Sequence, residues 1–227
     1  MGRALRHSLL HGEIVDQISP QGLVQMIAGA AAAIRARHAE LSHLDSLLGD
    51  GDHGATMLRI VERLEKAVAG QADLKSAMRE AGWAVLGVDG GASSALFGTF
   101  FLAAAEVVAF PFDTAGLATA FEAGLASVRE QTKAQTGDKT LMDALVPAVE
   151  GLRRAAEAGK PVEEALRDAA RDARAGAEST KSLVARYGRA KHLGDKTQGH
   201  PDPGAVSTAL LFEGFYNGLT RFESEDR

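Results

Sequence analysis

The residues with the clearest chemical potential are three aspartates in the first quarter of the chain. Asp45, Asp50 and Asp52 lie within eight residues, and only Gly51 separates the last two. Carboxylate oxygens in a loop suit Mg²⁺, which keeps several waters and is completed by substrate phosphates. Three carboxylates alone would repel a nucleotide, whereas two bound Mg²⁺ would bring the charge to about +1. The segment therefore predicts a two-magnesium site for a phosphorylated ligand.

Two other interpretations of this segment fail on its details. Residues 49–54 match the GxGxxG pattern of dinucleotide-binding loops, but no strand is expected before them and their aspartates would repel a pyrophosphate. The segment also begins like a calcium-binding loop, yet the bidentate glutamate of that loop is replaced by Val61. The remaining alternative is structural, because aspartates in most isolated Asp-Gly-Asp sequences only form turns or cap helices.

Three further glycine-containing segments are expected to border the same ligand. Residues 90–93 combine a tight turn with small side chains at a helix start, which permits close approach to a phosphate. Residues 137–141 lack the upstream glycine of a P-loop, and Lys139 has the alternative of a solvated surface charge. Residues 188–204 form a long loop of a kind that is usually functional or disordered in a compact helical domain. Together these segments predict one anion site built from backbone N–H groups and helix N-termini.

Composition restricts the other functions of the protein. A net charge of −5 and an isoelectric point near 5.8 give no basic surplus for nucleic acid. The absence of cysteine excludes disulfides, thiolate zinc sites and iron–sulfur clusters. Near the start, Leu9 and Leu10 form an apolar core too short for a signal peptide, and no run reaches the roughly 20 apolar residues of a membrane span. We therefore expect a cytoplasmic protein that binds neither nucleic acid nor a membrane.

The elements that position these loops are expected to be helices, so the fold class is all-α. Aromatic residues make up only 5% of the chain, and Ala, Leu, Glu and Arg recur at spacings of three and four. Ser19 and Pro20 predict the cap and first residue of a helix that carries Leu23, Ile27, Ile34 and Leu41 along one face. Seven further helices are predicted over residues 55–68, 73–87, 92–109, 114–130, 138–158, 161–186 and 203–221.

The boundaries of these helices predict how they are connected. Thr114 and Asp202 are expected to cap the helices that follow them, and the C-terminal RFESEDR is expected to fray. Short connections make consecutive helices antiparallel, in a bundle or a closed ring. No linker divides the chain, so one domain is expected over residues 1–227.

Taken together, the four segments resemble those of a known family, the nucleotide-binding L subunit of dihydroxyacetone kinase. The same domain forms the C-terminal part of single-chain dihydroxyacetone kinases. The family patterns LD-x4-GDGDHG, GGASG-x-LFGT, GDKTM-x-D and GRA-x2-LG…GH-x-DPGA are matched, in order and spacing, at residues 44–54, 90–99, 137–143 and 188–205. The resemblance implies an eight-helix antiparallel barrel that binds ADP or ATP at one end through two Mg²⁺.

The resemblance also assigns roles to individual residues. It makes Asp45, Asp50 and Asp52 the metal ligands and places them, with Arg189, in the catalytic machinery. The nucleotide contacts that it implies are His53, Gly54, Ala55, Thr56, Ala92, Ser93, Thr132, Leu141, Arg189, Asp202, Pro203 and Gly204.

Four positions depart from the family patterns. Thr56 replaces a frequent Asn, and Ser94 replaces a Gly. Leu141 replaces a Met beside the adenine and preserves apolar packing. Thr132 replaces a Gly in the loop that covers the nucleotide, and we expect this change to affect the flexibility of that loop and its contact with the nucleotide.

The family divides its reaction between subunits. The ketose is held covalently by a histidine of a separate K subunit, so this chain is expected to lack a ketose site. A phosphocarrier protein is the expected phosphate donor in the separate-subunit branch, with ATP as the alternative. The sequence leaves open which ketose is used and whether the chain forms a homodimer. The histidines expected to be surface or structural residues are His7, His11, His38, His43, His192 and His200.

Two other function classes compete with a phosphotransferase subunit. A helical metal-dependent phosphohydrolase usually needs a His-Asp dipeptide, with the histidine first, for its metals, and the sequence contains none. A non-catalytic regulator that binds ADP and docks to a transcription factor would keep the same metal and nucleotide site. Only an assay of phosphate transfer separates that regulator from the phosphotransferase.

Overall fold

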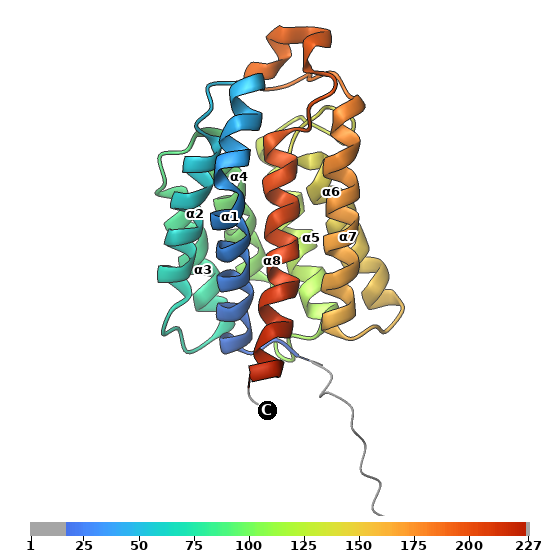
Figure 1. The fold of residues 1–227 in the computed structure, drawn as a ribbon. Helices are drawn as coiled ribbons and strands as arrows, with labels where there is room; N and C mark the ends of the chain where they lie inside the picture. Colours follow the sequence, from blue (N-terminus) through green and yellow to red (C-terminus); the bar gives the residue numbers. More distant parts are fainter. Residues whose placement is uncertain (1–16, 226–227) are drawn as a thin grey trace, which may run out of the picture.

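Every regular element in residues 17–225, the part of the chain that the computed structural model describes, is helical (Figure 1). The all-α prediction is therefore confirmed. The α-helices are α1 (Pro20–Leu48), α2 (His53–Val68), α3 (Leu74–Leu86), α4 (Gly91–Glu106), α5 (Thr114–Gln131), α6 (Met142–Glu157), α7 (Val162–Ser179) and α8 (Pro203–Glu225). Two 3₁₀ segments, η1 (Thr180–Ser182) and η2 (Arg189–Thr197), connect α7 to α8.

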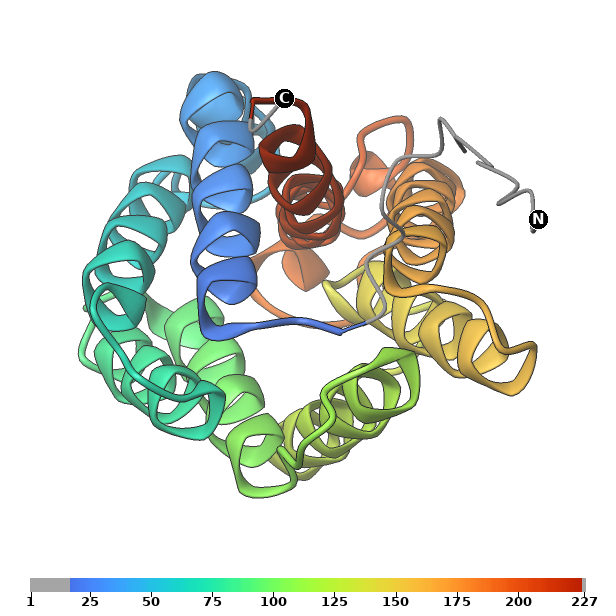
Figure 2. The ribbon, with the colours of Figure 1, turned by 90° about the horizontal axis from the view of Figure 1, so that it is seen from below.

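The eight helices form a closed ring, which Figure 2 shows in end view. Each helix packs against the next one in the sequence, and α8 returns to pack along α1. Successive helices run antiparallel, as predicted, and their connections are short except between α7 and α8, which η1 and η2 join. Consequently the loops before α2, α4, α6 and α8 all lie at one end of the ring (Figure 1).

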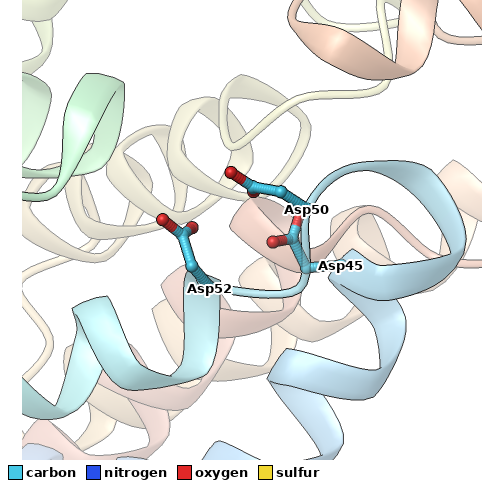
Figure 3. A group of neighbouring side chains, drawn as sticks. All are labelled: Asp45, Asp50 and Asp52. Carbon is cyan, nitrogen blue, oxygen red and sulfur yellow. The ribbon is translucent and has the colours of Figure 1, made fainter.

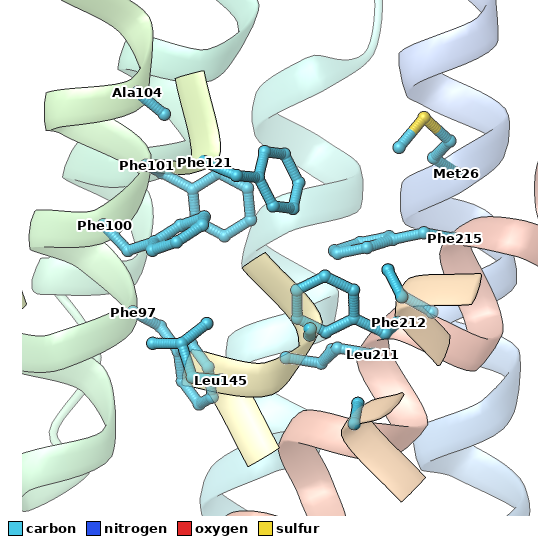
Figure 4. Close-up of a cluster of buried hydrophobic side chains, with 14 of the residues drawn as sticks. Met26, Phe97, Phe100, Phe101, Ala104, Phe121, Leu145, Leu211, Phe212 and Phe215 are labelled. Carbon is cyan, nitrogen blue, oxygen red and sulfur yellow. The ribbon is translucent and has the colours of Figure 1, made fainter. Parts of the chain in front are cut away.

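The interior of the ring is filled by apolar side chains from all sides (Figure 4). Phe100 and Phe121 pack edge to face with ring centroids 5.1 Å apart, and Phe212 and Phe215 of α8 extend the same cluster. Edge-to-face pairs of this kind contribute about 0.5–1.5 kcal/mol beyond their buried area. The interior of the ring is therefore occupied by side chains rather than by a ligand site.

Two of the three predicted helix caps are present. The Ser19 hydroxyl accepts a hydrogen bond from the Gly22 amide at 3.0 Å, and Asp202 accepts from the Ala205 amide at 2.7 Å. Thr114 is a correction, because the side chain that caps α5 is that of Asp113. The hydroxyl of Thr114 instead donates to the carbonyl of Lys160, which connects the starts of α5 and α7.

Several predicted boundaries were wrong. The helix predicted over 138–158 begins at Met142, because Lys139 adopts a left-handed φ of 61° and the turn before α6 is held by Asp143. The helix predicted over 161–186 ends at Ser179, and the one predicted over 92–109 ends at Glu106. Residues 221–225 of the segment expected to fray belong to α8, its last two residues lie outside the described part of the chain, and fraying itself stays a prediction.

The N-terminal segment that contains Leu9, Leu10, His7 and His11 lies outside the described residues. Among the helices of residues 17–225, none combines the length and apolar character needed to cross a bilayer.

Candidate functional site

A cleft of about 700 Å³ opens at the end of the ring where α1 ends and α8 begins. It is bordered by the loops before α2, α4, α6 and α8, together with η2 and the end of α5. The predicted meeting of the four glycine-containing segments is therefore present in the structure. The cleft-lining residues that the sequence singled out are Asp45, Asp50, Asp52, His53, Thr56, Ala92, Ser93, Thr132, Leu141, Arg189, Asp202, Pro203 and Gly204.

The three aspartates converge at the mouth of this cleft (Figure 3). One carboxylate oxygen from each lies within 4.8 Å of the other two. Gly51, with a left-handed φ of 80°, makes the turn that places Asp50 and Asp52 on the same side. Asp52 occupies the N-cap position of α2, but its side chain makes no capping hydrogen bond. The Asp52 carboxylate is therefore free of a capping role and available to a ligand.

The other two aspartates are held by opposite sides of the cleft. Asp45, near the end of α1, accepts a hydrogen bond from the His53 amide at 3.2 Å, which joins α1 to the start of α2. Asp50 forms an ion pair with Arg189 of η2. This ion pair brings a permanently charged guanidinium to the carboxylate cluster from a segment more than a hundred residues away in the sequence.

His53 lies behind the aspartates as a buried member of the wall. Its Nε2 is 2.9 Å from the Ser207 hydroxyl of α8, and its Nδ1 is 3.5 Å from the Ser93 hydroxyl of α4. Burial lowers the pKa of this imidazole, against the opposing charges of Asp45 and Asp52. Through these contacts the His53 ring connects α2, α4 and α8 at the base of the cleft.

The start of α4 offers an anion-binding helix terminus. Gly90 is its N-cap residue and supplies no side-chain cap, so the first N–H groups of the helix have no such partner. Arg59 of α2 holds this turn in place, because it donates to the Asp89 carbonyl and the Thr56 hydroxyl, each at 3.0 Å. The arrangement suits a phosphate group placed between this helix start and the aspartates.

The opposite wall is more apolar. Leu141 is 8% exposed and contributes its side chain beside Gly204. Thr132 ends α5 with an extended backbone (φ −136°) that any side chain adopts, and its hydroxyl accepts from the Ala134 amide at 3.1 Å. The replacement of glycine at this position therefore introduces no backbone strain.

Two of the predicted nucleotide contacts are not part of the cleft wall. Gly54 faces α1, where an added Cβ would lie 2.0 Å from the His38 carbonyl oxygen. Ala55 is exposed on α2 and does not line the cleft. The spacing of the motif could not separate residues that face the ligand from residues that permit close helix packing.

Several residues of the wall were not predicted from the sequence. Arg59 lies three residues after Thr56 and therefore on the same face of α2, a helical spacing that could have identified it. Tyr187 precedes Gly188 in the long loop, and no pattern distinguished it. The alternative of a solvated Lys139 was wrong, since this side chain is 2% exposed. The described histidines other than His53 lie away from the wall and are not buried: His38, His43, His192 and His200.

The fold and the motifs are those of a known family. The model of the Dak2 domain family matches residues 47–217. The ADP-binding subunit DhaL of PEP-dependent dihydroxyacetone kinase 1 from Listeria innocua is 39% identical over 175 residues, which are 76% of this chain and 83% of that subunit. The DhaL subunit of the PEP-dependent enzyme of Escherichia coli is 39% identical over 179 residues, which are 76% of this chain and 84% of that subunit.

Among solved structures, the dihydroxyacetone kinase of C. freundii in complex with AMP-PNP and Mg²⁺ matches with a TM-score of 0.68 and 25% identity. The match covers 96% of this chain and 37% of the C. freundii protein. The eight-helix ring is thus one part of that longer protein. Given the family match, the identities with both subunits and the shared fold, this chain belongs to the DhaL (Dak2) family of kinase subunits.

Proposed function

We propose that this chain is the nucleotide-binding phosphotransferase subunit of a kinase for dihydroxyacetone or a related ketose, acting with ADP or ATP and two Mg²⁺. The observation that carries the proposal is the cluster of three carboxylates at the mouth of a cleft bordered by four glycine-containing loops. The names of the relatives, which are ADP-binding subunits, support it. The C. freundii kinase in complex with AMP-PNP and Mg²⁺ supports the same ligand class.

The side chains present fit magnesium. Asp45, Asp50 and Asp52 offer only carboxylate oxygens, the hard ligands that Mg²⁺ prefers. The ion pair between Asp50 and Arg189 places one positive charge beside the cluster. When bound, Mg²⁺ supplies the charge that allows phosphate oxygens to approach three carboxylates.

The protein's own contribution would be to position and neutralise the transferred phosphate. Phosphoryl transfer depends mainly on positioning and electrostatic stabilisation, with little covalent chemistry by the protein. The uncapped start of α4 and the Ser93 hydroxyl supply donors on one side of the cleft. Arg189 supplies a planar charged donor from η2, and Leu141 supplies an apolar surface for the base.

The remaining parts of the proposal concern the partner and the donor. The ketose would be held by a K subunit that docks at the open end of the cleft, because the reacting atoms must approach to about 3–3.5 Å. The chain aligns with more than four fifths of each separate DhaL subunit, but with only 37% of the longer kinase of C. freundii. This similarity to the separate subunits of PEP-dependent enzymes favours bound ADP that is recharged by a phosphocarrier protein.

Calorimetry with ADP tests the metal and nucleotide site first. Binding is expected with Mg²⁺ and is expected to be nearly absent with EDTA, because the carboxylates alone repel phosphate. Equal affinity under both conditions would contradict the two-magnesium site.

A transfer assay tests the division of labour. Phosphorylation of dihydroxyacetone is expected only when the protein is combined with a K subunit and a charged phosphocarrier protein. Turnover without the K subunit would contradict the separate ketose site, and multiple turnovers on ATP alone would contradict the carrier as donor. Nucleotide binding without transfer in any combination would favour the ADP-binding regulator.

A further inference from the structure

A buried lysine in the wall of the cleft is not used by the proposed transfer reaction. Lys139 is 2% exposed and lies in the turn before α6, with a left-handed φ of 61°. Its ammonium group donates to the carbonyl oxygen of Thr180 at 2.5 Å and to that of His200. Burial of an ammonium group costs several kcal/mol unless hydrogen bonds and opposite charge offset it. We therefore ask what function offsets the cost of burying the Lys139 ammonium group.

The two carbonyl groups that Lys139 joins lie next to segments that form the wall of the cleft. Thr180 follows α7 directly, and its hydroxyl accepts a hydrogen bond from the Asp202 amide at 2.8 Å. His200 lies two residues before Asp202, and Leu141 lies two residues after Lys139. One ammonium group thus fixes the turn that carries Leu141 against the segment that carries Asp202.

Asp202 also responds to the charge of Lys139. Its carboxylate caps α8 by accepting the Ala205 amide at 2.7 Å, and it borders the cleft. Two charged side chains act on it: Lys139 favours the carboxylate form, and Asp143 opposes it. Removal from bulk water opposes that form most strongly, so the pKa of Asp202 is raised to about 7. Within the described residues Lys139 forms no ion pair, so its charge acts on Asp202 through space.

We propose that Lys139 is a positioning residue for the nucleotide, which fixes the Asp202 segment against the Leu141 turn and favours the carboxylate form of Asp202. A carboxylate at the cleft wall accepts hydrogen bonds from ligand hydroxyl groups, such as those of a nucleoside sugar. Protonation would remove part of this acceptor capacity and weaken the cap of α8 at the same time. The inference rests on the proposed function, because it requires a nucleotide in this cleft.

The test is calorimetry of ADP with Mg²⁺ over the pH range from 6 to 9, with wild type and the Lys139→Met variant. At pH 7 the variant is expected to bind ADP about ten-fold or more weakly, the loss of one charge-assisted contact. Its affinity is expected to recover in part toward pH 9, because Asp202 then ionises without the help of Lys139. A structural lysine would give a loss that is the same at every pH, and that result, or no loss, would overturn the inference.

A second, independent experiment combines the Lys139 substitution with a substitution of Asp202. In an Asp202→Asn background the Lys139→Met change is expected to cost less affinity than in wild type, because the carboxylate that it supports is already gone. Additive losses would overturn the electrostatic role. Lys133→Met is the matched control, because Lys133 is exposed on the same connection between α5 and α6 and lies outside the cleft wall. The affinity of this control variant for ADP is expected to stay unchanged.

The remaining controls keep the outcomes distinct. Circular dichroism at each pH reports whether a variant is folded. If Lys139→Met does not fold, Lys139→Arg keeps the positive charge and is expected to keep the wild-type midpoint of the pH profile, and a shifted midpoint would count against the inference. Failure of wild type itself to bind ADP with Mg²⁺ would contradict the proposed function, whereas wild-type binding with an unaffected Lys139→Met variant would contradict only the role of Lys139.

Discussion

Arg189 and Asp50 form an ion pair that joins η2 to the carboxylate cluster across the mouth of the cleft. The Arg189 guanidinium therefore pairs with Asp50, one of the carboxylates that would hold magnesium. Both side chains are substantially exposed, so the ion pair contributes only about 0–1 kcal/mol. Because this ion pair is weak, a bound metal ion can replace Arg189 as the partner of the Asp50 carboxylate. Arg189 is then available to bind a phosphate group.

The first prediction is that Arg189→Gln changes metal binding and nucleotide binding in opposite directions. Without nucleotide, the affinity for Mn²⁺ as a magnesium probe should rise by roughly two- to five-fold, because the competing cation is removed. The affinity for ADP with Mg²⁺ should fall about ten- to hundred-fold, the loss of one charge-assisted contact of about 1.5–3 kcal/mol. Electron paramagnetic resonance of Mn²⁺ and calorimetry of ADP measure the two effects.

Arg189→Lys provides the comparison that isolates geometry from charge. A lysine keeps the charge but not the planar pair of donors, so ADP binding should weaken toward the level of the Gln variant. Unchanged ADP affinity in both variants would show that η2 faces only solvent.

The second prediction concerns the two aspartates on either side of Gly51. Asp50→Asn and Asp52→Asn should each abolish phosphate transfer and leave the helical fold intact. Asp50 is exposed, and Asp52 makes no capping hydrogen bond, so neither carboxylate supports the fold by a buried contact. Transfer assays and circular dichroism measure the two properties.

Asp195→Asn is the matched control for these variants. It removes the same charge from an exposed position in η2 that does not line the cleft, and full transfer activity is expected. Activity in Asp50→Asn or Asp52→Asn equal to that of the control would return these aspartates to a turn-forming role.

The third prediction tests why Gly54 is a glycine. Gly54→Ala would place a Cβ 2.0 Å from the His38 carbonyl oxygen and push α2 away from α1. Because Asp45 lies on α1 and Asp52 at the start of α2, the same displacement would separate two members of the cluster. We expect the free energy of unfolding in urea to fall by about 1–3 kcal/mol, together with weaker Mn²⁺ binding.

Gly87→Ala is the control for this substitution. A Cβ at Gly87 would meet its nearest atoms at 3.6 Å, an ordinary contact, and the φ of −76° suits alanine. Its stability should change by less than about 0.5 kcal/mol. Equal effects of the two substitutions would show that the α1–α2 contact tolerates a methyl group.

The parts of the site that are formed by residues close together in the sequence could be predicted from the sequence alone. The carboxylate spacing around Gly51, the small residues before α4 and the Asp202-Pro203 start of α8 each depend on a few neighbouring residues. Antiparallel order with short connections then brings these loops to one end of the ring.

The buried environment of Lys139 could not be predicted in this way, because its two carbonyl partners lie 41 and 61 residues away. The start of α6 was placed four residues too early for a related reason. Asp143, inside the helix, holds the amides of Gly137 and Thr140 in a turn, and a helical period does not reveal that competition.

The last prediction is that Asp202 makes the free energy of unfolding depend on pH. The pKa of Asp202 is about 7 in the folded chain, against an ordinary value of 3.8. Between these values the folded state holds the proton that the unfolded state has released, so the contribution of this group to stability falls as pH rises from about 4 to 7 and is constant above. Asp202→Asn cannot ionise, and the difference in unfolding free energy between wild type and this variant should therefore shrink or reverse in favour of the variant over that range. Urea unfolding of both proteins at several pH values measures the difference, and a difference that is independent of pH would show that Asp202 keeps an ordinary pKa in the folded chain.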